Sequence, residues 1–559
     1  MLGLTMLGLG FLLGCGGSDQ AAPDSVAVDL GPDPASIVPA NAPIYLEGVV
    51  RPQGEQRDQL ESLLSAILDN DDPSDVILGA IEDAVAPGED FSYSESIDPW
   101  LGARVGGYIA DLNSGGYGVA DQAGAAGQYG GSGAQWVAAV AVTDIPAAIK
   151  ALSTIGKDQP PDPAVKERQY RGVAYAIDTD NDVAYGFISD FLVVGTEPEF
   201  KTSVDVVVGG RPALAEADQY RDAVRDLDPN RLFTAYTSID QLGKTELLSS
   251  AINPYFEKLA GRGETSVAEG LVVDNTIKFI ATAPPGPGFE APPTDLLADA
   301  PETSWLGFAV PTDKSNLRQL QPQFDEQLKQ LRSQLDQLGV ETPLKLDIDS
   351  TLRSTIGVDL SHDIAPWFNG LGFYLEGDSL LSLGGAFFTK TSDPEQSADT
   401  LDRIAAFLRA RNPDSIESPG DADAGFSLRS AGSLTRIGVV QRDDLVLVGF
   451  GQAAPVEGYE PAGRLGDTDR FNQARDLLSD GIEPAFYFDF EGLSALVGSF
   501  SAASSGALDP NFQAALSRFD LMTLGWTASD QEVRYEIVIS FQEGEEPTPE
   551  NASPAIILP

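Results

Sequence analysis

The stretch AIDTDNDVAYGFISDFLVVG, residues 176–195, holds short apolar runs separated by turn residues. Its runs Val183–Ile188 and Phe191–Val194 are rich in β-branched and aromatic residues, which is typical of strands. Only Ser189 and Asp190 connect these two runs. Because parallel strands need a crossover of roughly a dozen residues or more, the two strands must pair antiparallel. The stretch therefore predicts an antiparallel sheet.

The rest of the first half of the chain mixes the same strand pattern with helical patterns. Further strands are predicted at Val105–Leu112, Trp136–Val142 and Val173–Ile177. Apolar residues at spacings of three and four predict helices at Gln56–Leu68, Ser74–Val85, Ile145–Ile155 and Ala213–Leu227. An antiparallel sheet with helices packed on it belongs to the α+β class.

The second half of the chain echoes the first. PANAPIYLEGVVRP (39–52) is answered by LADAPETSWLGFAVP (297–311), and DPWLG (98–102) is answered by APWFNG (365–370). Further on, DQYRDA aligns with DRFNQA, and RLFTAYTSIDQL aligns with PAFYFDFEGLSAL, all in the same order. We interpret this as an internal duplication, and the predicted fold is two tandem similar α+β lobes, each an antiparallel β-sheet with helices packed on it.

The duplication and the composition of the segments between its copies predict the domain boundaries. Residues 284–295, PPGPGFEAPPTD, are too rich in proline and glycine for the interior of an element. The predicted parts are a signal peptide (1–14), a lipidated cysteine with a flexible tether (15–36), a first repeat (37–283), a linker (284–295), a second repeat (296–541) and a disordered acidic, proline-bearing tail (542–559).

The N-terminus carries the one cysteine of the chain, Cys15. The apolar run Leu2–Leu13 would reach only about 18 Å as a helix, which is short of the roughly 30 Å hydrocarbon core of a bilayer. Leu12-Leu13-Gly14-Cys15 resembles the lipobox of bacterial lipoproteins, which implies cleavage before Cys15 and lipidation of its thiol. An ordinary cleaved signal peptide that ends near a cysteine is the alternative. Both interpretations export the protein, and lipidation places it on the outer face of the cytoplasmic membrane.

The opening alanine-proline strand, the Pro-Trp-Leu-Gly turn and the closing GLVVDNTIKF hairpin carry a second resemblance. They resemble a family of uncharacterised bacterial proteins, common in actinobacteria, that is defined by a domain of unknown function. The resemblance spans most of residues 37–541. It implies an exported and often lipid-anchored protein without assigned activity, so it supplies no catalytic residues.

The composition excludes one class of partner. The formal net charge is -50, from 85 acidic and 35 basic residues, and this charge repels nucleic-acid phosphates. If Cys15 carries lipid, the folded part has no cysteine for a disulfide, and its stability has to come from core burial.

The sequence contains little that points to catalysis. His362 is the one histidine, so a zinc site of several histidines is impossible, and we interpret His362 as a polar loop residue. Two carboxylates alone can hydrolyse a glycosidic bond, but with so many acidic residues a suitable pair arises by chance. We therefore predict no enzyme and no cofactor.

Asp178, Asp180 and Asp182 alternate as calcium ligands often do. An EF-hand loop would need glycine and glutamate where the chain has Val183 and Ser189. We therefore favour a solvated hairpin turn over a metal site for these weak candidates.

Three further features are interpreted as structural. Trp100 and Trp367 stand at matching Pro-Trp turns and are predicted core anchors, with two equivalent ligand pockets as the alternative. The glycine-rich stretch 113–133 is a predicted mobile loop. An apolar stripe in the second copy is predicted to pack on its own sheet, with a partner helix as the alternative; its members are Leu317, Leu320, Phe324, Leu328, Leu331, Leu335 and Leu338.

These observations predict an exported, lipid-anchored, non-catalytic envelope protein that binds or scaffolds. Its predicted partners are the membrane, through the N-terminal lipid, and a protein or small molecule that the sequence does not identify. A solute-binding lipoprotein of a transporter is the alternative, although that class usually has parallel α/β lobes. An acid-pair hydrolase is a third hypothesis, and it would need a cleft with a raised carboxyl pKa.

Overall fold

The computed structural model of the protein describes fourteen stretches of the chain. They are residues 29–85, 92–112, 134–153, 164–242, 264–285, 296–311, 357–379, 381–411, 413, 416–418, 422–429, 436–451, 463–503 and 510–542. The chain forms two compact units. The first holds Met1–Pro287, Ser529–Arg534 and Phe541–Pro559, and the second holds Gly288–Ala528 and Tyr535–Ser540.

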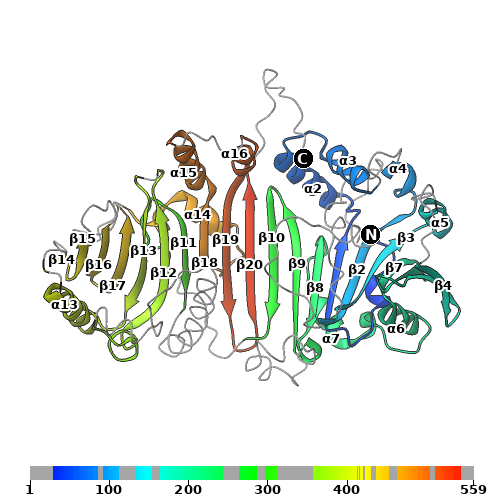
Figure 1. Ribbon diagram of the computed structural model, residues 1–559, viewed down its shortest axis with the longest axis horizontal. Coiled ribbons are helices and arrows are strands. Elements are labelled where there is room, and N and C mark those ends of the chain that lie inside the picture. Colours follow the sequence, from blue (N-terminus) through cyan, green and yellow to red (C-terminus); the bar gives the residue numbers. More distant parts are fainter. Residues whose placement is uncertain are drawn as a thin grey trace, which may run out of the picture. The chain divides into compact units, whose positions relative to one another are not determined.

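In the first unit, β1 (Ile44–Val49) pairs with β2 (Leu101–Leu112) on one side and with β8 (Phe233–Ser238) on the other. The other strands are β3 (Ala134–Val142), β4 (Val165–Tyr170), β5 (Val173–Asp178), β6 (Val183–Ile188), β7 (Phe191–Thr196), β9 (Thr265–Val273) and β10 (Thr276–Ala283). Their order is β4-β5-β6-β7-β3-β2-β1-β8-β9-β10, and each of these pairs is antiparallel (Figure 1).

In the second unit, β11 (Ser304–Val310) takes the place of β1, between β12 (Phe368–Glu376) and β18 (Pro484–Asp489). The other strands are β13 (Gly384–Thr391), β14 (Ile416–Glu417), β15 (Ala424–Arg429), β16 (Arg436–Arg442), β17 (Leu445–Gly451), β19 (Phe519–Ala528) and β20 (Val533–Phe541). Their order is β14-β15-β16-β17-β13-β12-β11-β18-β19-β20. The second unit therefore repeats the strand order of the first.

The predicted fold class, two α+β lobes each with its own helix-covered sheet, is wrong. The described strands belong to one 20-stranded antiparallel sheet, and strand residues outnumber helical ones. Periodicity and short turns predict which neighbours in the chain pair with each other. They do not predict whether strands far apart in the chain join a common sheet, because that depends on backbone hydrogen bonds rather than on side-chain pattern.

The hairpins of residues 176–195 form as predicted, as β5, β6 and β7. The turns need left-handed backbone, and Asp182 and Ser189 take φ values of 54° and 51° there. Asp and Asn tolerate this conformation because their short side chains hydrogen-bond locally. The strands predicted at 105–112 and 136–142 are also confirmed, within β2 and β3.

Three predicted helices are confirmed as α2 (Glu55–Leu68), α3 (Pro73–Val85) and α5 (Ile145–Leu152). The single helix predicted at 213–227 is wrong, because Ala217 is extended (φ -71°, ψ 127°) and separates η2 (Leu214–Glu216) from α7 (Asp218–Val224). The other described helical segments are η1 (Pro34–Ile37), α4 (Tyr93–Ser96), α6 (Glu197–Val207), α8 (Ile239–Leu242), η3 (Leu360–Ile364), α13 (Pro394–Arg411), η5 (Leu465–Asp467), α14 (Asp469–Asp476), α15 (Phe490–Ala503) and α16 (Pro510–Leu516).

The packed core of the first unit begins before residue 37. Asp33 caps η1 by accepting a hydrogen bond from the Ala35 amide at 2.9 Å. Ala35 is fully buried and Ile37 nearly so, and both belong to the core cluster around Tyr45. The residues before position 37 are small and polar, as in a tether. The last of them nevertheless form the capped helix η1, which packs in the core.

Each unit has a tyrosine face, which we define by a row of residues that are direct strand partners. In the first unit the row is Tyr108, Tyr45 and Tyr236, and Tyr220 of α7 meets the last two edge-on. In the second unit the row is Tyr374, Gly307 and Tyr487. All three tyrosines of the first row are buried, so this face is the inner surface of the unit.

Candidate functional site

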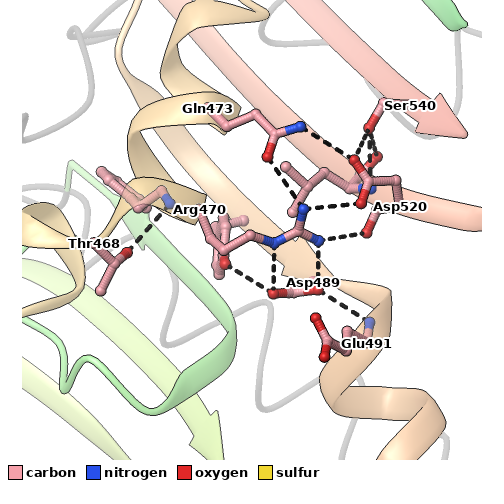
Figure 2. Close-up of polar contacts among 10 residues, drawn as sticks. Thr468, Arg470, Gln473, Asp489, Glu491, Asp520 and Ser540 are labelled. Carbon is pink, nitrogen blue, oxygen red and sulfur yellow. Dashed lines mark hydrogen bonds and ion pairs between the residues drawn. The ribbon is translucent and has the colours of Figure 1, made fainter. Parts of the chain in front are cut away.

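Arg470 of α14 is the centre of a charged cluster in the second unit (Figure 2). α14 begins at Asp469 because the Thr468 hydroxyl caps it, accepting a hydrogen bond from the Phe471 amide at 3.2 Å. The apolar side of the short helix buries Phe471 and Ala474 in the core. This packing places Arg470 in the first turn, beside the end of β18 and the start of β19.

The Arg470 guanidinium forms a two-pronged ion pair with Asp489. Nε lies 3.1 Å from Oδ2 of Asp489, and Nη2 lies 2.9 Å from Oδ1. On the other side, Nη1 lies 2.9 Å from Oδ1 of Asp520. Both carboxylates are largely buried, with 13% and 12% of their side chains exposed. Charge-assisted pairs of this geometry are the strong class of hydrogen bond.

The remaining donors of the guanidinium are also used. Nη1 donates to Oε1 of Gln473 at 3.1 Å, and Nη2 donates to the Asp520 carbonyl at 3.4 Å. These five hydrogen bonds match the five N–H donors of arginine. Gln473 Nε2 and Ser540 Oγ each donate to Oδ2 of Asp520 at 3.2 Å, as Figure 2 shows.

This arrangement holds elements of the second unit together. Hydrogen bonding to Asp489, and then to Asp520, raises the pKa of Arg470 above its already high ordinary value. The guanidinium therefore stays charged and offers no base for proton transfer. It links α14 to β18 and β19, and Ser540 extends the link to β20.

A second charged cluster lies at the tyrosine face of the first unit, around Glu47 of β1. Glu47 is 9% exposed; its Oε2 accepts from the Tyr45 hydroxyl at 2.8 Å and its Oε1 from Arg104 at 3.2 Å. Burial raises the pKa of the Glu47 carboxyl, and nearby Asp33 raises it further, whereas Arg104 lowers it by less.

A second buried glutamate, Glu269 of β9, lies in register with Glu47 through Thr234 of β8. Glu269 accepts a hydrogen bond from the Asp228 amide at 2.7 Å, which ties down the loop after α7. Glu536 does the same in the second unit, accepting from the Ser479 amide at 2.9 Å. Burial raises the pKa of Glu269. The repeated contact indicates a structural role for these carboxyls.

A third cluster surrounds Glu197, the first residue of α6. Its carboxylate accepts hydrogen bonds from the Tyr175 hydroxyl and Arg168, each at 2.6 Å, and pairs with Lys201 at 2.9 Å. Burial alone would raise the pKa of Glu197, but the hydrogen bonds from Tyr175, Lys201 and Arg168 lower it to about 2. The carboxylate also stands at the positive end of the α6 dipole.

The structure places Asp178, Asp180 and Asp182 in the β5–β6 turn. Asp178 Oδ1 accepts from the Asp180 amide at 2.9 Å, and its Oδ2 accepts from the Asn181 side chain at 2.6 Å. The Asn181 hydrogen bond lowers the pKa of Asp178. Across the described ranges, no group of three or more His, Cys, Asp or Glu side chains is placed to hold a metal ion. The carboxylate of Asp178 shapes the turn.

The other candidate residues lie in two settings. His362 is on the surface, with 84% of its side chain exposed and Nδ1 3.1 Å from Asp359. Trp100 and Trp367 are buried in core clusters of their own units. Both indoles make the same contact: Nε1 donates to the carbonyl four residues earlier, Ser96 or Asp363, at 2.6 Å. The tryptophans therefore anchor matching turns.

Several predicted features lie outside the described residues. These are Cys15 with the signal peptide, the glycine-rich stretch 113–133, the apolar stripe of residues 317–338, residues 286–295 of the linker and the tail after residue 542. In the described part of the chain, no helix is long and apolar enough to cross a membrane.

Sequence reasoning missed the Arg470 cluster, because the duplication gave only part of the signal. Arg470 stands where the first copy has Gln219. Asp489 matches Ser238 only through the strand registers of the structure, in which Tyr487 and Tyr236 hold the same place in their rows. Asp520 carried no signal in the sequence.

The comparisons with known proteins give a family but no activity. A family model described as a protein of unknown function (DUF3352) matches residues 29–541. No curated protein matches the chain. Crystal form I of TP0453 is similar at 10% identity and a TM-score of 0.23, and the match covers 46% of this chain. Crystal form III is similar at 11% identity and a TM-score of 0.24, and the match covers 45% of this chain. Each match covers 80% of the TP0453 chain. At these TM-scores the likeness carries no argument about fold or function. Because the family model spans nearly the whole described chain, the protein belongs to the DUF3352 family of proteins of unknown function.

Proposed function

We propose that this protein is an exported, lipid-anchored envelope protein that binds or scaffolds rather than catalyses. The lipobox-like Leu12-Leu13-Gly14-Cys15 supports the anchor, since acyl chains on a terminal cysteine hold a protein on a membrane surface. The proposed location is the outer face of the cytoplasmic membrane. The net charge of -50 argues against nucleic acid as a partner.

The non-catalytic part of the proposal rests on the hydrogen bonding of the Arg470 guanidinium. Its five donors are all used within the fold, by Asp489, Asp520 and Gln473. A catalytic guanidinium needs donors free for a substrate or for charge that develops during the reaction. A cluster in which all of these donors bind the protein's own strands and helix supports a scaffold.

The anchor is tested by expressing the full chain in a bacterial host that acylates lipoproteins. The wild-type chain is expected in the membrane fraction, with an N-terminal peptide whose mass includes acyl chains on Cys15. The Cys15→Ala chain is expected in the soluble fraction without that mass. Ser18→Ala, three residues away, is the matched control and keeps the wild-type pattern. A Cys15→Ala chain that stays in the membrane fraction contradicts the anchor.

The non-catalytic part is tested separately on the purified wild-type protein and an Asp489→Asn, Asp520→Asn double variant. Hydrolysis of polysaccharide or glycoside substrates by the wild type, lost in the double variant while its circular dichroism is unchanged, would contradict a scaffold. We expect no turnover by either protein.

A further inference from the structure

The loop after α6 exposes two bulky apolar residues side by side. Val207, the last residue of α6, is 40% exposed, and Val208 is 46% exposed. The next four residues, 209–212, are exposed as well. We call residues 207–212 the valine loop. Because single exposed valines are common on protein surfaces, the pair acquires a meaning only from its surroundings.

The valine loop is held in one conformation by the end of the helix. Gly209 takes a left-handed backbone with a φ of 76°, and its amide donates to the Val206 carbonyl at 3.1 Å. The Gly210 amide donates to the Asp205 carbonyl at 2.7 Å. Helices that end in this way often carry an apolar residue after the glycine, which packs back on the helix. Gly210 has no side chain for that contact, and the two valines stay exposed.

Two arginines lie beside the valines. Arg211 belongs to the loop, and within the described part of the chain it has no carboxylate at ion-pairing distance. Arg171 of the β4–β5 turn lies against the loop, since a Cβ at Gly210 would be 2.8 Å from its Nη1. Nε of Arg171 pairs with Oδ1 of Asp205 at 3.0 Å, and 48% of the arginine side chain is exposed against 16% for the aspartate. The sequence has no acidic residue from 206 to 215, so the exposed charge of the loop is positive.

This local positive charge can act in spite of the formal net charge of -50. At physiological ionic strength, exposed charges more than about 8 Å apart are largely screened from each other. Acidic residues farther from the loop than this have little effect there, whereas Arg171 and Arg211 act on whatever touches the loop. A nucleic acid would offer phosphates but no apolar layer for the valines. A membrane surface offers lipid phosphates and, directly beneath them, the start of the acyl chains.

The valine loop also lies next to the segment that follows the proposed lipid anchor. The Ala40 amide donates to the Pro212 carbonyl at 3.0 Å, and Pro39 forms a β-bridge with Ala213. Ala40 and Pro39 come shortly after η1, where the N-terminal part of the described chain joins the core. A lipid on Cys15 would therefore keep the loop within a tether's length of the bilayer, which raises its effective concentration at the surface.

We propose that the valine loop, together with Arg171, is a second contact of this protein with an anionic membrane surface. The two valines enter the region between headgroups and acyl chains, and the two guanidiniums bind lipid phosphates. A contact of this size is weak by itself, but an acyl chain combined with a cationic patch anchors a protein stably. The inference rests on the proposed membrane location. Its test uses a chain without lipid, so that a failure of this contact is distinguishable from a failure of the anchor.

A fluorescent label at position 208 tests the contact. Cys15→Ala removes the one cysteine of the sequence, so Val208→Cys in that full chain supplies a single thiol for a nitrobenzoxadiazole label. With vesicles of phosphatidylethanolamine and phosphatidylglycerol, we expect the emission to rise severalfold and to be quenched by lipids that carry a nitroxide on the acyl chain. The matched control is a label introduced through Val273→Cys, because Val273 is 44% exposed in the same unit, and it should not respond. No rise at position 208, or an equal rise at both positions, overturns the proposal.

Charge variants test the part played by the arginines. In the Cys15→Ala chain, Arg171→Gln with Arg211→Gln should lower binding to the same vesicles about tenfold, because each cation near an anionic surface adds to the attraction. The matched control is Arg221→Gln with Arg225→Gln, which removes two exposed charges elsewhere in the first unit and should leave binding unchanged. Equal losses in the two double variants, or equal binding to vesicles of phosphatidylcholine alone, overturn the proposal.

Discussion

Removing Arg470 should destabilise the second unit more than removing any surface arginine. In Arg470→Ala, Asp489 and Asp520 lose their shared cation while remaining 13% and 12% exposed. Breaking a buried ion pair on one side costs about 3–5 kcal/mol, whereas an exposed pair contributes about 0.2–1 kcal/mol. Because Arg470 itself is 32% exposed, solvent reaches part of the cluster, and we expect a loss near the lower bound, about 3 kcal/mol.

The assay is urea unfolding followed by circular dichroism, with the free energy of unfolding compared among variants. Arg221→Ala is the matched control: Arg221 also lies on a short helix, α7, and pairs with Asp218, but 57% and 88% of these side chains are exposed. We expect it to lose less than about 0.5 kcal/mol. A triple variant, Arg470→Met with Asp489→Asn and Asp520→Asn, should recover part of the loss because it leaves no charge unpaired. If Arg470→Ala and Arg221→Ala lose equal stability, the cluster is not the internal link described above.

Three further predictions concern the first unit and the matching tryptophans. The raised pKa of Glu47 means that the folded state binds its proton more tightly than the unfolded state. The contribution of Glu47 to the free energy of unfolding is therefore present below its ordinary pKa of 4.5 and is lost as the pH rises. In urea titrations, Glu47→Gln should gain stability relative to wild type between pH 4 and pH 7, and a relative loss would refute the sign. The pKa of Glu197, lowered to about 2, has the opposite effect. The contribution of Glu197 to the free energy of unfolding is present above pH 4.5 and is lost as the pH falls toward 2. The destabilisation by Glu197→Gln should therefore shrink from pH 7 to pH 3, and a pH-independent difference from wild type would contradict this prediction. Trp100→Phe and Trp367→Phe each remove a hydrogen bond and part of a buried ring, and each should lower the free energy of unfolding by about 1–2 kcal/mol; a loss in only one variant would show that the two turns are not equivalent.

Local structure was the most predictable part of this protein. The strands of residues 176–195 form because apolar runs and turn residues act over a few neighbouring positions, where Asp182 and Ser189 take the left-handed backbone that the short connections need. The prediction of a single helix at 213–227 was wrong because the backbone of Ala217 is extended, which the apolar spacing did not reveal. The stretch before residue 37 shows the same limit, since its composition resembled a tether while Ala35 lies in the core.

The charged clusters were less predictable than the strands. Comparing the two copies reveals Arg470 in place of Gln219, but it does not reveal its partner Asp489, which matches Ser238 only in the strand register of the structure. Asp520 and Ser540 could not have been found either, since they come from strands whose register brings them to the end of α14 only in the folded chain. Candidates that stood out in the sequence, such as Asp178 and His362, proved to be turn and surface residues.

The sequence by itself determined the antiparallel hairpins, three helices, the echo between the halves of the chain and the absence of the residues for a multi-histidine zinc site. Only the tertiary structure decided that the strands form one sheet, that each unit repeats the same strand order, and that Arg470 is fully engaged by two buried carboxylates. The physical reason is the distance along the chain over which each kind of interaction acts. Turn geometry and side-chain periodicity act between near neighbours in the chain, whereas sheet membership and ion pairing depend on backbone and charged groups that only the complete fold brings within hydrogen-bonding distance.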